Sequence, residues 1–243
     1  MVGSGSYGLS HPDDCHVFLF ASGAKGEEHL ALVDAGSGSD TAAILENVRR
    51  AGYDPRRIER IFLTHAHRDH AGGCASLIAE LPECRIAASA AEAELLEHGT
   101  ADQLGLNRLG FSDDDRAEVL PPQRVDDILT DGQVMHLGDV RVEAVLTPGH
   151  NPGCMCFLVE IDSKRVLFAG DTIFCGGYIS VGNWPGSELK TYQEHIGRLS
   201  GLNVDVLLSG HHVFTVSNGQ QHIDRAVETF AGLWPPPQIN TVL

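Results

Sequence analysis

Residues 65–70 read His-Ala-His-Arg-Asp-His and are the segment of the chain most suited to chemistry. On an irregular loop, alternate positions can turn His65 and His67 toward one metal ion, while Asp69 and His70 face another. Neutral imidazole and carboxylate are natural ligands of zinc and similar divalent ions. The motif therefore predicts metal binding and leaves the reaction open. A chance surface cluster of histidines is the simpler alternative.

Three later segments carry further ligand-type residues, each directly after an apolar run. They are Thr147-Pro148-Gly149-His150, Ala169-Gly170-Asp171-Thr172 and Leu208-Ser209-Gly210-His211. Asp34 likewise ends the apolar run 29–33. In layered α/β folds the ends of strands meet along one edge, where ligands and metals usually bind. We therefore expect these residues to act with the histidine motif.

The elements that must position these residues follow from apolar patterns and turn residues. We expect a helix that Ser39 or Asp40 caps and Gly52 ends, and a short helix through Leu77 and Ile78. Residues 89–118 are rich in Ala, Glu, Leu and Asp and are expected to form a helical insertion, serving as a lid or a dimer surface. The expected strands are 16–20, 29–33, 58–64, 134–137, 140–146, 155–161, 166–169 and 204–209, followed by a helix around 223–230.

In order along the chain, Asp34, His-x-His-x-Asp-His, His150, Asp171 and His211 resemble the five-part pattern of the metallo-β-lactamase fold superfamily. The resemblance implies an α/β fold, a four-layer αββα sandwich, formed by one domain over 1–243. It also implies that Asp34 orients the ligand loop. The implied ligands are His65, His67 and His150 for one metal, Asp69, His70 and His211 for the other, and Asp171 as the bridge.

This ligand set implies a dinuclear hydrolase, in which a hydroxide between the metals cleaves a carboxylic ester, lactone or thioester. Asp69 would be the catalytic proton acceptor. Zinc is the expected metal, two ions per chain, with iron or manganese as alternatives.

The bridging aspartate resembles the glyoxalase II-like and lactonase-like branches, because true β-lactamases of the superfamily lack it. Two departures separate the chain from their best-known members. Only about 30 residues follow His211, whereas glyoxalase II continues into a helical glutathione-binding region. Acyl-homoserine lactonases carry a tyrosine three residues after the bridging aspartate, where this chain has Phe174; Tyr178 is a candidate substitute.

Other reactions on the same scaffold remain as alternatives. A persulfide-dioxygenase-like oxidoreductase would use one iron, and β-lactam hydrolysis would use the same ligands without the bridge. Nucleic-acid processing is disfavoured by the net charge of −16, because phosphate binding needs clustered Lys and Arg. His212 is left open between an alternative ligand, a substrate contact and an exposed residue.

Composition bounds the remaining expectations. Hydrophobic residues at 42% and charged residues at 21% are typical of a globular chain. No apolar run reaches the roughly 18 residues that span a bilayer, and the N-terminus has no signal-peptide pattern, so a cytoplasmic enzyme is expected. Its expected partners are a small-molecule substrate and a second copy in a homodimer, with no nucleic acid and no membrane. The six scattered cysteines are expected to be mostly reduced, with Cys154 and Cys156 in the core.

Overall fold

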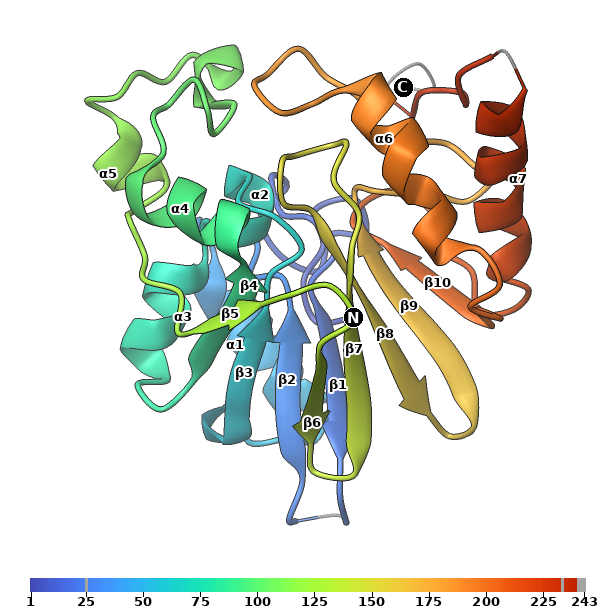
Figure 1. Cartoon of the computed structure of the whole chain (residues 1–243). Coiled ribbons are helices and arrows are strands. Elements are labelled where there is room, and N and C mark those ends of the chain that lie inside the picture. The colour runs from blue at the N-terminus through green and yellow to red at the C-terminus, as the bar shows by residue number, and fades with distance from the viewer. Residues whose placement is uncertain (25, 233, 240–243) are drawn as a thin grey trace. The chain divides into compact units, whose positions relative to one another are not determined.

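The computed structural model of the chain consists of two compact units, each with a five-stranded sheet (Figure 1). The residues described are 1–24, 26–232 and 234–239. The N-terminal unit comprises Met1–Leu129 and His136–Asp139, and the C-terminal unit comprises Thr130–Met135 and Val140–Leu243. Among the described residues, no helix is long and apolar enough to cross a membrane. The single domain over 1–243 stays a prediction.

The first sheet has the order β1-β2-β3-β4-β5. β1 pairs antiparallel with β2, and the other neighbours are parallel. Parallel strands are covered on both faces and therefore read as nearly continuous apolar runs, as Leu30–Val33 does. The bounds are β1 Phe18–Ser22, β2 His29–Val33, β3 Ile58–Phe62, β4 Arg85–Ser89 and β5 Asp127–Leu129.

The first long helix of the N-terminal unit, α1 (Thr41–Arg50), confirms its predicted signals. The Asp40 carboxylate accepts from the Ala43 N–H at 3.1 Å, and Gly52 has the left-handed φ of +91° just beyond the helix end. One face of α1 buries Ile44, Leu45 and Val48 in the same core as β2 and β3. The other helices are η1 Pro55–Arg57, α2 Arg68–Ala71, α3 Cys74–Glu80, α4 Ala90–His98, η2 Leu106–Leu109 and α5 Arg116–Val119.

The predicted helical insertion at 89–118 is confirmed, because α4, η2 and α5 lie within it. The strands on either side of it, β4 and β5, were not predicted. β4 reads Arg-Ile-Ala-Ala-Ser, which carries one β-branched residue, so nothing in its composition favours a strand. Its parallel pairing with β3 and β5 fixes its conformation instead.

The second sheet has the order β10-β9-β8-β7-β6, with β8 antiparallel to β7 and β9 and β10 parallel to β9. Ile223, Ala226 and Phe230 of the amphipathic helix α7 pack in the core of the C-terminal unit, which confirms the predicted helix there. Helix α6 was not predicted. The bounds are β6 Val134–Leu137, β7 Val140–Leu146, β8 Met155–Ile161, β9 Lys164–Gly170, α6 Leu189–His195, η3 Ile196–Leu199, β10 Val206–Ser209 and α7 Gln220–Ala231.

Candidate metal centre

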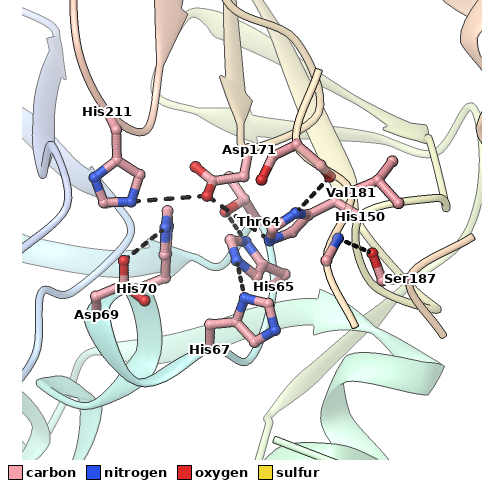
Figure 2. A network of polar contacts seen from close by, with 12 residues as sticks. Thr64, His65, His67, Asp69, His70, His150, Asp171, Val181, Ser187 and His211 are labelled. Carbon is pink, nitrogen blue, oxygen red and sulfur yellow. Dashed lines mark hydrogen bonds and ion pairs between the residues drawn. The ribbon is translucent and has the colours of Figure 1, made fainter. Parts of the chain in front are cut away.

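The histidine motif lies just beyond the carboxyl end of β3 and runs into α2, all within the N-terminal unit. His65 and His70 are fully buried, and their ring centroids are 4.0 Å apart. His65 Nε2 lies 3.0 Å from His67 Nδ1, and His70 Nε2 lies 3.5 Å from Asp69 Oδ2 (Figure 2). The structure therefore brings together the four ligand-type residues of the motif.

A buried carboxylate, Asp34 at the end of β2, holds this loop. It accepts from the Thr64 N–H at 2.8 Å, from the Thr64 hydroxyl and from His70 Nδ1 at 2.8 Å. An ionised carboxylate can only accept, so His70 must carry its proton on Nδ1, and Nε2 is left as the lone-pair nitrogen. This is the outer contact that metal-binding histidines commonly make. The orienting role expected for Asp34 is thus matched by its contacts.

Asp34 has the left-handed φ of +61°, an uncommon conformation for a residue with a side chain. Its backbone N–H donates to the Phe62 carbonyl at 2.9 Å, so neighbouring strands hold it in place. The next loop is equally close-packed. A Cβ on Gly73 would lie against the carbonyl oxygen of Ala35, and the Ala35 N–H donates to the His70 carbonyl at 2.7 Å. Only a glycine at 73 allows this approach.

A second buried carboxylate, Glu92 on α4, supports the same loop and was missed in the sequence analysis. Its Oε2 accepts from the Ala66 N–H at 2.8 Å, between the two ligand-type histidines 65 and 67. Ser89 and Glu92 match the Ser-x-x-Glu capping pattern, which predicts that Glu92 bonds the backbone of Ser89. Glu92 also accepts from the histidine loop, and no local pattern signals that contact.

A cysteine, Cys15, also lies near this set, because its Sγ is within 4.8 Å of ligand atoms of Asp34 and His70. Burial raises the pKa of its thiol to about 12, so it is a protonated side chain at neutral pH. Asp34 and His70 are bonded to each other, which gives this trio a structural explanation as a hydrogen-bonded cluster.

The ligand-type residues of the C-terminal unit come from the ends of three strands. His150 follows β7, Asp171 follows β9 and His211 follows β10. Asp171 Oδ2 lies 3.7 Å from His150 Nε2 and 3.7 Å from His211 Nε2 (Figure 2). The Gly210 N–H donates to the Gly170 carbonyl at 2.7 Å, which fixes the spacing of the last two strand ends. The structure therefore places one carboxylate oxygen equally far from two imidazoles.

A backbone carbonyl fixes His150 within this second set. His150 Nδ1 donates to the Ser180 carbonyl at 2.9 Å, which again leaves Nε2 as the lone-pair nitrogen. The buried Tyr192 hydroxyl, missed in the sequence analysis, lies 3.0 Å from the Asp171 carbonyl and 3.2 Å from that of Ser180. Its burial raises its pKa well above the ordinary value. A Cβ on Gly149, whose φ is +148°, would clash with the Tyr192 ring.

Four residues whose roles were uncertain from the sequence, His212, Tyr178, Cys154 and Cys156, lie in different surroundings. His212 has a left-handed φ of +60°, and its ring centroid lies 6.4 Å from that of His211 and 6.0 Å from that of Phe174. Burial, then the neighbouring His211, lowers its pKa. Tyr178 is half-buried and its carbonyl accepts from the Phe174 N–H at 2.9 Å, so its role as a substitute for the lactonase tyrosine stays a hypothesis. Cys154 and Cys156 are buried, as expected.

The donor chemistry of both sets fits a divalent metal ion. The candidate ligands are imidazoles and carboxylates, and two of the imidazoles have Nδ1 fixed by an acceptor, so that Nε2 carries the lone pair. Two mixed sheets with helices and with such residues at their strand ends define an α/β protein with candidate metal-binding residues.

The chain belongs to the metallo-beta-lactamase superfamily, whose family model matches residues 12–211. A metallo-beta-lactamase motif mutant from Cronobacter sakazakii is similar in structure, with a TM-score of 0.66, 30% identity, and 84% of this chain and 75% of that chain covered. The predicted fold class is therefore confirmed.

Two curated proteins are similar in sequence. An uncharacterized protein from Aquifex aeolicus is 32% identical over 80% of this chain and 83% of its own length. An atrochrysone carboxyl ACP thioesterase from Aspergillus fumigatus is 26% identical over 92% of this chain. The match covers 58% of the length of that thioesterase.

Proposed function

We propose that this chain is a dinuclear metal-dependent hydrolase that cleaves a thioester. His65, His67 and His150 would hold one ion, Asp69, His70 and His211 the other, and Asp171 would be shared. The assignment rests on the family pattern, which is filled at each of these positions. Zinc is the proposed metal, because imidazole and carboxylate donors without cysteine suit it.

The observation that carries the proposal is the fixed orientation of ligand-type imidazoles in both units. The buried Asp34 accepts from His70 Nδ1, and the Ser180 carbonyl accepts from His150 Nδ1. A carboxylate or carbonyl behind a ligand imidazole fixes its tautomer and raises its basicity toward a metal. A chance surface cluster of histidines would not be buried and oriented in this way.

Two bound divalent ions would supply an activated water near neutral pH and polarise the scissile carbonyl. The protein residues would then orient the substrate and deprotonate the water. Asp69 is suited to accept a proton, since its side chain is 33% exposed whereas His70 beside it is fully buried. The deep histidines would hold position, and Asp69 would face solvent and substrate.

Thioester cleavage is the reaction favoured within this class because the curated relative matching 92% of the chain is described as a thioesterase. Carboxylic esters and lactones share the attack on a carbonyl carbon and are the nearest alternatives. β-Lactam hydrolysis is the reaction named for the similar solved structure, so it belongs in the same test.

The test combines metal analysis with a substrate panel. Protein purified without chelator is analysed for metal content, then loaded with zinc and assayed on neutral thioesters, aryl esters, lactones and a chromogenic β-lactam. We expect two metal ions per chain and the highest kcat/KM on a thioester.

His98→Ala is the matched control, because His98 is an exposed histidine at the end of α4. It should keep both the metal and the activity. A single iron with oxygen consumption on a persulfide, or faster turnover of the β-lactam than of any thioester, would overturn the proposal.

A further inference from the structure

A hollow of about 440 Å³ lies within the N-terminal unit beside the histidine motif. It is lined by Asp13, Arg68, Asp69, Leu109 and Phe111. The volume falls in the range of small-molecule sites, and the lining combines two apolar side chains with three charged ones. Because Asp69 is the proposed proton acceptor, whatever fills this hollow would lie beside the reacting group.

The apolar wall of the hollow comes from the helical insertion. Leu106 is fully buried and anchors η2, whereas Leu109 at its end is 60% exposed. Gly105 and Gly110 flank η2 with φ of +71° and +86°, left-handed turns that favour glycine. The segment also passes close to the motif, since a Cβ on Gly105 would lie 3.7 Å from His67 Nε2. The turns thus hold an exposed leucine beside the candidate site.

Arg68, the positively charged residue that lines the hollow, is already paired with protein groups. Arg68 Nη1 donates to Asp13 Oδ2 at 3.1 Å, and Nη2 donates to Ser39 Oγ at 3.0 Å. The guanidinium carbon lies 6.0 Å from the centroid of the Phe111 ring. Both terminal nitrogens of Arg68 therefore have partners within the protein, and the group contributes a flat surface next to Phe111 rather than a site for an anion.

We propose that this hollow binds the acyl part of the substrate, and that it selects an uncharged, apolar acyl group over a short or an anionic one. The inference rests on the proposed thioesterase function and names its substrate class. Leu109 and Phe111 remove the acyl chain from water, and the paired Arg68 gives no counter-charge to a terminal carboxylate. Burying a carboxylate there would remove its hydration without providing an ion pair in exchange.

The test uses N-acetylcysteamine thioesters, which keep the leaving group small and neutral. Each buried methylene is expected to raise kcat/KM by up to about fourfold, so hexanoyl should exceed acetyl by at least about tenfold. Butyryl should exceed succinyl, which has the same number of carbons, by at least about tenfold. Equal kcat/KM values for acetyl, hexanoyl and succinyl would overturn the inference while leaving the thioesterase function intact.

Variants locate the selectivity. Leu109→Ser and Phe111→Ala should each lower the hexanoyl-to-acetyl ratio at least about threefold, mainly through KM. Ile128→Ser is the control, because Ile128 is 47% exposed on β5 and does not line the hollow. Asp13→Asn should release Arg68 and raise the succinyl-to-butyryl ratio. An unchanged ratio in all three pocket variants would place the acyl site elsewhere.

Binding without turnover separates this inference from the proposed function. Hexanamide, a neutral analogue of the acyl part, is titrated calorimetrically into the metal-free protein, and Leu109→Ser should weaken its binding at least about threefold relative to Ile128→Ser. If no thioester is cleaved by the zinc-loaded protein, the proposed function fails. If hexanamide binds no better than acetamide, the acyl site fails.

Discussion

Each unit fixes one of its ligand-type histidines with a different kind of acceptor. In the N-terminal unit, side-chain carboxylates do so: Asp34 fixes His70, and Glu92 holds the loop at Ala66. In the C-terminal unit a backbone carbonyl fixes His150, with Tyr192 braced against the same segment. A side chain can be deleted by mutation but a carbonyl cannot. The N-terminal set should therefore be the more easily disturbed by substitutions behind the ligands.

The largest effects should come from the ligands themselves, equally in both units. Replacing His67 or Asp171 by alanine should lower turnover at least about a hundredfold, because each removes a donor that acts on the reaction itself. Metal content per chain and kcat on the best thioester are the measurements. Circular dichroism should show a folded chain. Wild-type turnover in either variant would show that the replaced residue is not a ligand.

Asp34→Asn should come next and should show the asymmetry directly. Asparagine tolerates the left-handed φ of +61° and keeps the shape, but it lacks the charge that fixes the proton on His70 Nδ1. Changing such an outer partner typically weakens metal affinity 10- to 100-fold. Competition with a zinc chelator measures the affinity. If Asp34→Asn binds zinc as tightly as the wild type, the carboxylate behind His70 does not contribute to zinc affinity.

The same comparison explains what the sequence could and could not predict. Residues 65–70 carry four donors in six consecutive positions, so chain connectivity alone brings them together. His150, Asp171 and His211 are far apart in sequence, and only strand order brings their chain positions to one sheet edge. The strand order was not predicted; the resemblance to a known pattern implied that these residues are ligands.

The supporting residues were beyond prediction for a physical reason. Glu92 stands in an alanine- and glutamate-rich helix, where a glutamate is usually solvated, and nothing nearby signals that it accepts from Ala66. Tyr192 lies on an unpredicted helix, 21 positions from the carbonyl of Asp171 that it contacts. Such contacts depend on tertiary packing, as does the pairing that makes β4 a strand. Neither the side-chain contacts nor the pairing of β4 can be predicted from local secondary-structure propensity.

Tyr192→Phe should have a smaller effect on function than Asp34→Asn. It removes a buried hydroxyl that lies within hydrogen-bond distance of two carbonyls, and losing such a bond costs about 1–3 kcal/mol of stability. The direct bond from His150 to Ser180 remains, so zinc affinity should fall less than about tenfold. Urea unfolding and chelator competition are measured on the same samples. A loss of affinity as large as that of Asp34→Asn would remove the distinction between the units.

The smallest effect is expected for a charged group of the N-terminal sheet outside the histidine motif. Hydrogen bonds from Arg85, at 2.8 and 3.1 Å, hold the pKa of Asp127 on β5 below its ordinary value of 3.8, and Arg60 adds to this. A carboxylate with a lowered pKa stabilises the fold above about pH 4. That stabilisation is lost as pH falls through the folded-state pKa.

Since Arg85 is half exposed, solvent screening keeps the contribution small. Asp127→Asn should therefore unfold at slightly lower urea than the wild type at pH 7, and the difference should shrink as the pH falls below about 4. Zinc affinity at pH 7 should equal that of the wild type. A stability gap that does not shrink below about pH 4 would mean that the Asp127 side chain acts through packing rather than charge. A change in zinc affinity would show that Asp127 also acts on the histidine loop.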